Sequence, residues 1–300
     1  MKRSTFLAAV ISSALGIHSF AADAPSSASG ASKPLRVLLI TGGCCHDYKA
    51  QKDILKKGIE ERANAAVEVI WASKTEEKNG VTSIVNDGST KPALPIYGNP
   101  DYAKGFDVVI HDECAADIKD FAIIAGVLKP HFDGTPGVNL HCAMHCYRFG
   151  EYQKPVARDA ENAHWYEYLG LQSTGHGPQE PIAITFTAKD SPITKGLADW
   201  TTIKEELYNN IQILTGKDLA KGKQITKGKD GATKETETVV AWTNEYGPKK
   251  TRVFSTTIGH NNATVEDARY LDLVTRGVLW SAGKLNDDGT PAKGYGPGGK

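Results

Sequence analysis

Two things that the sequence lacks narrow its function. It has no apolar run of about 18 residues, the length that a helix needs to span a membrane. It also lacks net charge, because 35 Lys and Arg residues are balanced by 35 Asp and Glu residues. A balanced chain offers no extended basic surface for nucleic acid or anionic lipid. We therefore expect neither of these as a partner.

The N-terminus has the features of a secretory signal. Lys2 and Arg3 precede a short apolar run over residues 5–17, and Ser19 and Ala21 offer small side chains before a cleavage site. This pattern predicts a secreted or periplasmic protein with no membrane segment after cleavage, and a membrane-anchored N-terminus is the alternative. The predicted organisation is a signal peptide over 1–21, a flexible leader over 22–33, a folded domain over 34–285 and a disordered tail over 286–300.

Cysteine is scarce and its number is odd. The chain has five cysteines, so in an exported protein at least one thiol stays free or pairs between chains. A disulfide between the Cys44/Cys45 turn and the Cys142/Cys146 segment is plausible in an oxidising compartment. The sequence leaves this pairing, that of Cys114 and the oligomeric state open.

The first half of the chain alternates between predicted strands and helices. This rhythm is typical of an α/β fold with right-handed crossovers, and it predicts an open, mostly parallel sheet with helices on both faces. The predicted strands cover Leu35–Thr41, Val67–Ala72, Phe106–Ile110 and Val138–His141, with helices over Lys49–Arg62 and Ile118–Leu128.

The second half has a different texture. Short segments, most of them rich in β-branched residues, predict additional or antiparallel strands. They cover Pro181–Thr187, Glu206–Ile213, Thr238–Thr243 and Arg252–Ile258. A long loop or short excursion is expected over Ser73–Tyr102, an exposed hairpin or loop over Gly216–Thr236, and a closing helix over Thr264–Gly283.

Histidines follow the predicted strands at the points where the strands end. Because the carboxyl ends of parallel strands form one rim of a sheet, and ligands bind at that rim, these side chains are expected to meet in one pocket. The histidines concerned are His46, His111, His141, His145 and His260.

The segment Asn139–His145 resembles a nucleophile elbow, the sharp turn from strand to helix that presents one residue at the top of a sheet. Asn139 and Ala143 take the glycine positions of that motif, and His141 takes the nucleophile position. His141 and His145 have the i, i+4 spacing that can chelate a metal on a helix. The alternative is that both histidines are satisfied within a packing layer.

The remaining candidates concern acid–base chemistry, a metal and the substrate. His260, after the strand Arg252–Ile258, is expected to act as a general base. Glu113, after the third strand, is a further metal-ligand candidate, although Asp112 or Glu113 could equally cap the next helix. Substrate contacts are expected from the Gly42–Gly43 turn, because its N–H groups suit an anion. They are also expected from His164, which lies beside aromatic residues, from His176 in a Gly-His-Gly-Pro loop, and from Asn261.

Together these segments resemble the trehalose-utilisation (ThuA-like) family, whose fold is similar to that of class I glutamine amidotransferases and of flavodoxin. The matching stretches are RVLLITGG with a following histidine, GVNLHCAMH, HWYEYLG with GHGPQEPI, EELYNNI, and VVAWTNEYG with RVFSTTIGHN. In amidotransferases the elbow residue is a catalytic cysteine, with a histidine and an acid after a late strand. Here His141 takes the cysteine position, His260 matches the histidine, and Asn262 replaces the acid.

The resemblance implies sugar metabolism rather than glutamine hydrolysis. We expect an exported enzyme that acts on a keto-disaccharide or a related glycoside, with His46, His141 and His260 as the catalytic core. His46, His141, His145 and Glu113 would suit a divalent Zn, Mn or Fe ion, and no nucleotide cofactor is expected. The alternatives are a non-catalytic carbohydrate-binding protein and a hydrolase that uses Cys142.

Overall fold

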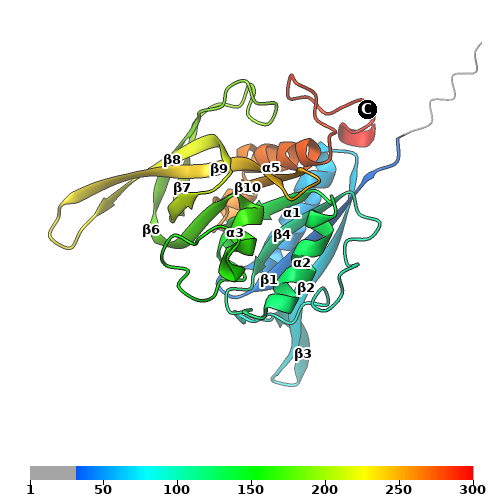
Figure 1. Ribbon diagram of the computed structural model, residues 1–300, viewed down its shortest axis with the longest axis horizontal. Helices are drawn as coiled ribbons and strands as arrows, with labels where there is room; N and C mark the ends of the chain where they lie inside the picture. The colour runs from blue at the N-terminus through cyan, green and yellow to red at the C-terminus, as the bar shows by residue number, and fades with distance from the viewer. Residues whose placement is uncertain (1–31, 300) are drawn as a thin grey trace, which may run out of the picture. The chain divides into compact units, whose positions relative to one another are not determined.

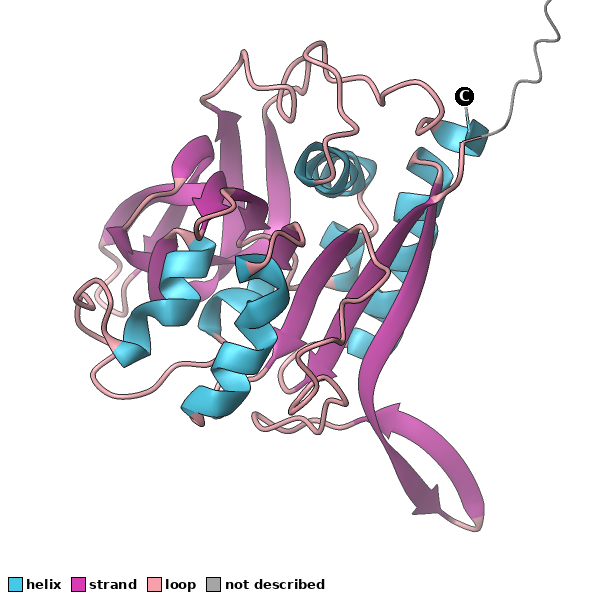
Figure 2. Cartoon of the chain, turned by 45° about the vertical axis from the view of Figure 1, so that its right-hand side comes forward, coloured by secondary structure: helices cyan, strands magenta, loops and turns pink. Residues whose placement is uncertain are grey.

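The first strand shows why the chain builds a layered α/β structure. In the computed structural model, which describes residues 32–299, β1 covers Leu35–Gly43 and is buried along almost its whole length. Val37 and Leu39 pack against α1 and α5 on one face of the sheet, whereas Leu38 and Ile40 pack against α2 and α3 on the other. The prediction of helices on both faces of the sheet is confirmed (Figures 1 and 2). The helices cover Tyr48–Arg62 (α1), Phe121–Phe132 (α2), His164–Leu169 (α3), Asn262–Val265 (α4) and Ala268–Ser281 (α5).

One ten-stranded sheet runs through the structure in the order β3-β2-β1-β4-β5-β10-β9-β8-β6-β7. The central strands β2, β1, β4, β5 and β10 pair in parallel, and all the other pairings are antiparallel. The predicted parallel unit and the added C-terminal strands are both present, and the sheet as a whole is mixed. The remaining strands cover Ala65–Lys78 (β2), Val81–Asn86 (β3), Val108–Cys114 (β4), Gly137–Leu140 (β5), Leu171–Phe186 (β6), Trp200–Ile213 (β7), Lys217–Lys227 (β8), Thr233–Tyr246 (β9) and Thr251–Thr256 (β10).

Several elements differ from the prediction in extent. The stretch expected to be a long loop begins with a β2–β3 hairpin, which projects from the body of the sheet (Figure 1). Strand β4 continues to Cys114, four residues beyond its predicted end. The closing helix α5 starts at Ala268 and is capped by Asp267, whose carboxylate accepts from the N–H of Arg269. Thr264 belongs to the short helix α4 instead.

The prediction of a disordered tail is wrong for residues 286–299. The N–H of Asn64 donates to the carbonyl of Tyr295, and its side chain donates to the carbonyl of Gly294. The Tyr295 ring packs against the core and lies under the ammonium group of Lys284. The Gly/Pro/Lys composition of the tail led to the prediction of disorder, whereas the packing of Tyr295 orders the tail. The predicted signal peptide and residues 22–31 of the leader lie outside the described residues. Among the described residues, no helix is long and apolar enough to cross a membrane.

Replacing either of two helical glycines with alanine is expected to change stability in opposite directions. A Cβ on Gly277 in α5 would lie 2.3 Å from the buried Phe254 ring, whereas a Cβ on Gly126 in α2 would meet nothing within 4 Å. Overpacking costs about 1–3 kcal/mol, and Ala is favoured over Gly in a helix by about 1 kcal/mol. We therefore expect Gly277→Ala to lower the free energy of unfolding and Gly126→Ala to raise it, as measured by urea denaturation. Equal effects of the two variants would contradict the packing described here.

Candidate active site

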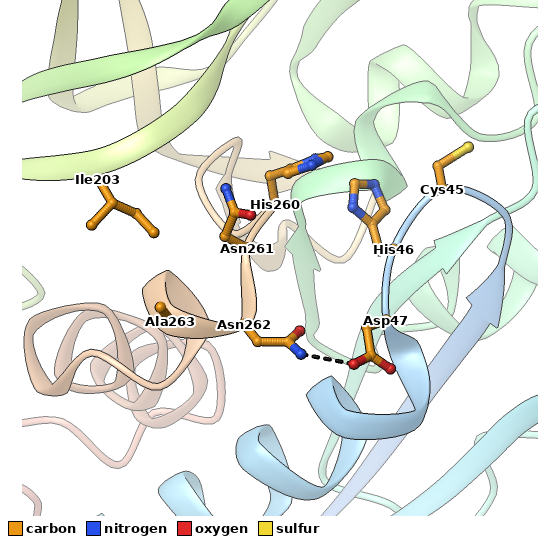
Figure 3. Close-up of a pocket in the computed structure, with 8 residues that line it drawn as sticks. All are labelled: Cys45, His46, Asp47, Ile203, His260, Asn261, Asn262 and Ala263. Carbon is orange, nitrogen blue, oxygen red and sulfur yellow. Dashed lines mark hydrogen bonds between the residues drawn. The ribbon is translucent and has the colours of Figure 1, made fainter.

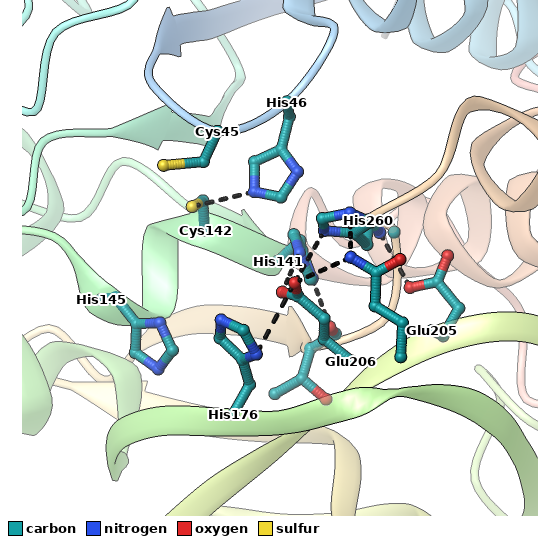
Figure 4. A network of polar contacts seen from close by, with 12 residues as sticks. Cys45, His46, His141, Cys142, His145, His176, Glu205, Glu206 and His260 are labelled. Carbon is teal, nitrogen blue, oxygen red and sulfur yellow. Dashed lines mark hydrogen bonds and ion pairs between the residues drawn. The ribbon is translucent and has the colours of Figure 1, made fainter.

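Three predicted catalytic histidines meet at one rim of the sheet. His46 follows β1, His141 follows β5 and His260 follows β10, so parallel strands carry all three to the same edge. One imidazole nitrogen from each lies within 4.8 Å of those of the other two. The His46 ring centroid is 4.6 Å from that of His141 and 4.7 Å from that of His260 (Figure 4).

His141 stands on a sharp turn, as the elbow resemblance predicted. Strand β5 ends at Leu140, and a 3-10 turn over His141–His145 follows it directly. His141 has a φ of +40°, in the left-handed region that costs a non-glycine residue about 1–3 kcal/mol. Its Nδ1 donates to the carbonyl of Thr257 at 2.6 Å, and its buried Nε2 faces the carboxylate of Glu206.

His46 is held as a neutral imidazole. Burial, followed by repulsion from His141 and His260, lowers its pKa to about 2. Its Nε2 lies 3.2 Å from the Sγ of Cys142, and its Nδ1 has no hydrogen-bond partner among residues 32–299. A neutral ring with a free nitrogen can act as a ligand or as a hydrogen-bond acceptor.

The loop that carries His260 is fixed through its backbone. The N–H of His260 donates to Glu205 at 2.9 Å, and its carbonyl accepts from the side chain of Gln51 at 3.0 Å. The ring Nδ1 lies 3.2 Å from Oε1 of Glu206, and this contact raises the pKa of His260. Gln51 and Glu205 are thus positioning residues for this imidazole.

Glu206 completes the site, and sequence reasoning missed it. Its Oε2 lies 3.5 Å from Nε2 of His141, and its Oε1 lies 3.6 Å from Nδ1 of His176. Burial opposes ionisation, but hydrogen bonds from His141 and His260 outweigh it and hold the pKa of Glu206 well below its usual range. The signal in the sequence was an acid at the start of a predicted strand, which is also typical of ordinary surface strands.

Two predicted substrate residues lie beside this cluster. The side chain of His176, on β6, is half exposed and faces Glu206 (Figure 4). Asn261 donates through its backbone N–H to Glu205 and through its side chain to the carbonyl of Lys204. Asn262, in the position of the amidotransferase acid, donates to Asp47, the residue that caps α1 (Figure 3).

Two predicted metal ligands lie outside the cluster of three histidines, although His145 lines a cavity beside it. His145 stacks on Tyr208 at 4.2 Å, and its Nε2 lies 2.9 Å from the hydroxyl of Ser173. Glu113 lies within β4, where its Oε1 accepts from Tyr147 and lies 2.9 Å from Nδ1 of His111. Because β4 extends beyond its predicted end, His111 and Glu113 form a fully buried network instead of reaching the pocket.

Three predicted substrate contacts are also displaced. His164 opens α3, where its ring packs against Phe121 at 5.2 Å in the helical layer. Gly42 and Gly43 have φ values of +116° and +101°, and neither lines the cavities at the site. A Cβ on Gly43 would lie 2.5 Å from the carbonyl oxygen of Cys114, so close packing between β1 and β4 requires glycine here.

The cysteines pair differently from the expectation. Cys44 and Cys45 form a disulfide with each other, whereas Cys114, Cys142 and Cys146 are free and buried. A hydrogen bond with Cys114, followed by burial, raises the pKa of Cys142 well above its usual value. The Cys142 thiol is therefore protonated at neutral pH, which does not favour the hypothesis of a thiol hydrolase.

Two cavities flank His46. A cavity of about 560 Å³ opens on one side, and one of about 400 Å³ on the other side is also lined by Cys142, His176 and Glu206. Both sizes suit a small molecule. The residues that line the first are Cys45, His46, Asp47, Ile203, His260, Asn261, Asn262 and Ala263 (Figure 3).

Comparison with known proteins agrees with the resemblance found in the sequence. Residues 133–281, which include His141, Glu206 and His260, match the model of the ThuA family, described as trehalose utilisation. The chain is a ThuA-like protein. A comparison with curated proteins found no match.

Two solved structures are similar to this ThuA-like chain. A putative ThuA-like protein from Parabacteroides merdae shares 19% identity, with 87% of this chain and 97% of that chain covered and a TM-score of 0.58, which supports the fold. A glutamine amidotransferase from Thermotoga maritima aligns at 9% identity, with 83% of this chain and 96% of that chain covered and a TM-score of 0.39.

Proposed function

We propose that this ThuA-like protein is an enzyme that processes a keto-sugar or a related glycoside with the help of one divalent metal ion. The observation that carries the proposal is a set of three buried imidazole nitrogens close to one another, two of which also face one carboxylate. These nitrogens are Nδ1 of His46, Nε2 of His141 and Nδ1 of His260, and the carboxylate is that of Glu206.

The donor set fits such an ion. Neutral imidazoles suit Zn, Mn or Fe, and zinc binds histidine nitrogens at about 2.0–2.1 Å. The bond from Nδ1 of His141 to the Thr257 carbonyl is the outer contact that orients a metal-binding imidazole and leaves Nε2 as the ligand. Three imidazole nitrogens within 4.8 Å of one another need only small side-chain rotations to share one ion.

The residues of the chain then have separate roles. A metal ion at the three histidines would polarise a carbonyl group of the substrate. With His141 and His260 engaged by the ion, Glu206 would lose the hydrogen bonds that lower its pKa and would be placed to accept a proton from a carbon next to that carbonyl or from water. His176 would contact the substrate from the cavity side of Glu206.

Two observations support a sugar as the substrate. The family model carries the description trehalose utilisation. A third cavity, of about 700 Å³, adjoins the site at His176 and Tyr208, and amide and hydroxyl side chains that suit sugar hydroxyls dominate its lining. They include Gln153, Thr174, Asn209, Asn210, Gln224, Thr226, Thr236 and Thr238. The N-terminal sequence supports export as part of the proposal.

Removal of the metal should abolish turnover of a 3-keto-glycoside. We expect a purified protein treated with a chelator to lose activity and to regain it with Zn²⁺, Mn²⁺ or Fe²⁺, because no side chain replaces the ion as a carbonyl activator. Product formation is measured by chromatography. His164→Ala is the matched histidine control and should behave as the wild type, since its ring lies in the helical layer. A metal-free, inert protein that still binds sugar would instead indicate a non-catalytic binding protein.

A further inference from the structure

Four sulfur atoms lie beside the histidines, and the proposed function does not use their chemistry. The Sγ atoms of Cys44, Cys45 and Cys114 all lie within 4.8 Å of one another, and Cys142 adjoins His46. Cys44 and Cys45 form a disulfide, and the free Sγ of Cys114 lies 3.4 Å from the Sγ of Cys44. A free thiol in contact with a disulfide sulfur meets the first requirement of thiol–disulfide exchange, and rotation of the Cys44 and Cys114 side chains would bring the three sulfurs into line for the attack.

We propose that Cys114 exchanges with the Cys44–Cys45 disulfide, so that the protein interconverts between a Cys44–Cys45 form and a Cys44–Cys114 form. The thiolate of Cys114 attacks Sγ of Cys44, and a new S–S bond forms between them. The Cys44–Cys45 bond breaks, and its electron pair leaves with Cys45. The proton that Cys114 loses ends on Cys45. One disulfide and one thiol are present before and after, so the step needs no oxidant or reductant.

The register of the sheet makes the second form attainable. Gly43 at the end of β1 pairs with Cys114 at the end of β4, which places Cys44 one residue beyond the partner of Cys114. Neighbouring strands lie about 4.8 Å apart, and disulfides join Cα atoms about 4.4–6.8 Å apart. A Cys44–Cys114 bridge would therefore join two adjacent strand ends without a rearrangement of the sheet.

The surroundings of Cys114 also favour it as the attacking sulfur. A hydrogen bond with Cys142 lowers the pKa of Cys114, and the positive charge of Arg148 acts in the same direction. Burial raises the pKa of Cys146, whose Sγ donates to the carbonyl of Glu113. Cys146 therefore does not compete for the disulfide.

Exchange would change what the cavities contain. Cys45 is exposed, directly precedes His46 and lines the cavities on both sides of it (Figure 4). Its release as a thiol creates a modification site for soft electrophiles next to the histidine cluster. The inference depends on sulfur positions alone and does not require that the proposed sugar chemistry is correct.

Alkylation of the native, unreduced full chain tests this inference. The protein is incubated with iodoacetamide at neutral pH, digested at acid pH, where exchange stops because thiolates are protonated, and mapped by mass spectrometry. We expect carbamidomethyl-Cys45 in molecules that contain a Cys44–Cys114 linkage. In Cys114→Ser, labelling of Cys45 should fall by about 10-fold or more, because no internal thiol can release it.

Cys146→Ser is the matched control. A serine hydroxyl can still donate to the Glu113 carbonyl, and Cys146 does not touch the disulfide, so labelling of Cys45 should match the wild type. A wild-type map with only the Cys44–Cys45 linkage and unlabelled Cys45 would overturn the proposal. Equal labelling of Cys45 in wild type and Cys114→Ser would also overturn it. The wild-type map decides the question even if a variant does not fold.

Discussion

Replacing Glu206 with glutamine is expected to lower turnover of a 3-keto-glycoside by about 10²–10⁴-fold, the usual contribution of a general base. Glutamine has nearly the same shape, so the contacts with His141 and His260 keep their geometry. What is lost is the negative charge that accepts the proton. Steady-state kinetics should show the loss in kcat, with metal content retained.

Glu151→Gln provides the matched control for Glu206→Gln. Glu151 is a surface acid whose side chain is 78% exposed and, within the part of the chain that the structure describes, pairs only with Lys154, so the substitution should leave turnover unchanged. If Glu206→Gln kept turnover within a factor of about three of the wild type, the assignment of this carboxylate as the base would be wrong.

Replacing His141 with alanine is expected to weaken metal binding by more than about 100-fold. Loss of an outer-shell contact already costs 10–100-fold in metal affinity, and removal of a ligand should cost more. Competition with a chromophoric chelator measures the affinity, and His164→Ala should bind as the wild type does. Retention of wild-type affinity in His141→Ala would remove this imidazole from the site.

The left-handed backbone at His141 calls for a second variant. Asparagine tolerates positive φ better than most residues, so His141→Asn separates the loss of the imidazole from backbone strain. We expect both variants to lose metal affinity and His141→Asn to unfold at the higher urea concentration of the two. If only His141→Ala bound metal poorly, distortion of the turn would explain its effect.

The convergence of His46, His141 and His260 was predictable from the sequence. Each follows a short apolar strand, and the carboxyl ends of parallel strands share one rim. The same reasoning was wrong for Glu113, because β4 extends through HDEC and keeps Glu113 within the buried sheet. Apolar character marked where β4 begins but not where it ends, since its last residues are polar yet form hydrogen bonds with each other and with Tyr147.

The role of Glu206 could not be predicted from strand order or hydropathy. Strand β7 is the edge strand at the far end of the sheet from β3, and its sequence does not show that it returns to the parallel rim. The pairing of β6 with β7 contains several register shifts, the irregularities that bend and twist strands. Through this bent ribbon Glu206 and His176 reach the histidines, and such bends leave little trace in a single sequence.

Anomalous diffraction from crystals of the metal-loaded full chain tests the central claim most directly. The account predicts one strong peak at the edge of the added metal, about 2.0–2.2 Å from a nitrogen of each of His46, His141 and His260. A structure with no peak at these nitrogens, or with the metal held only by the cysteines, would contradict it.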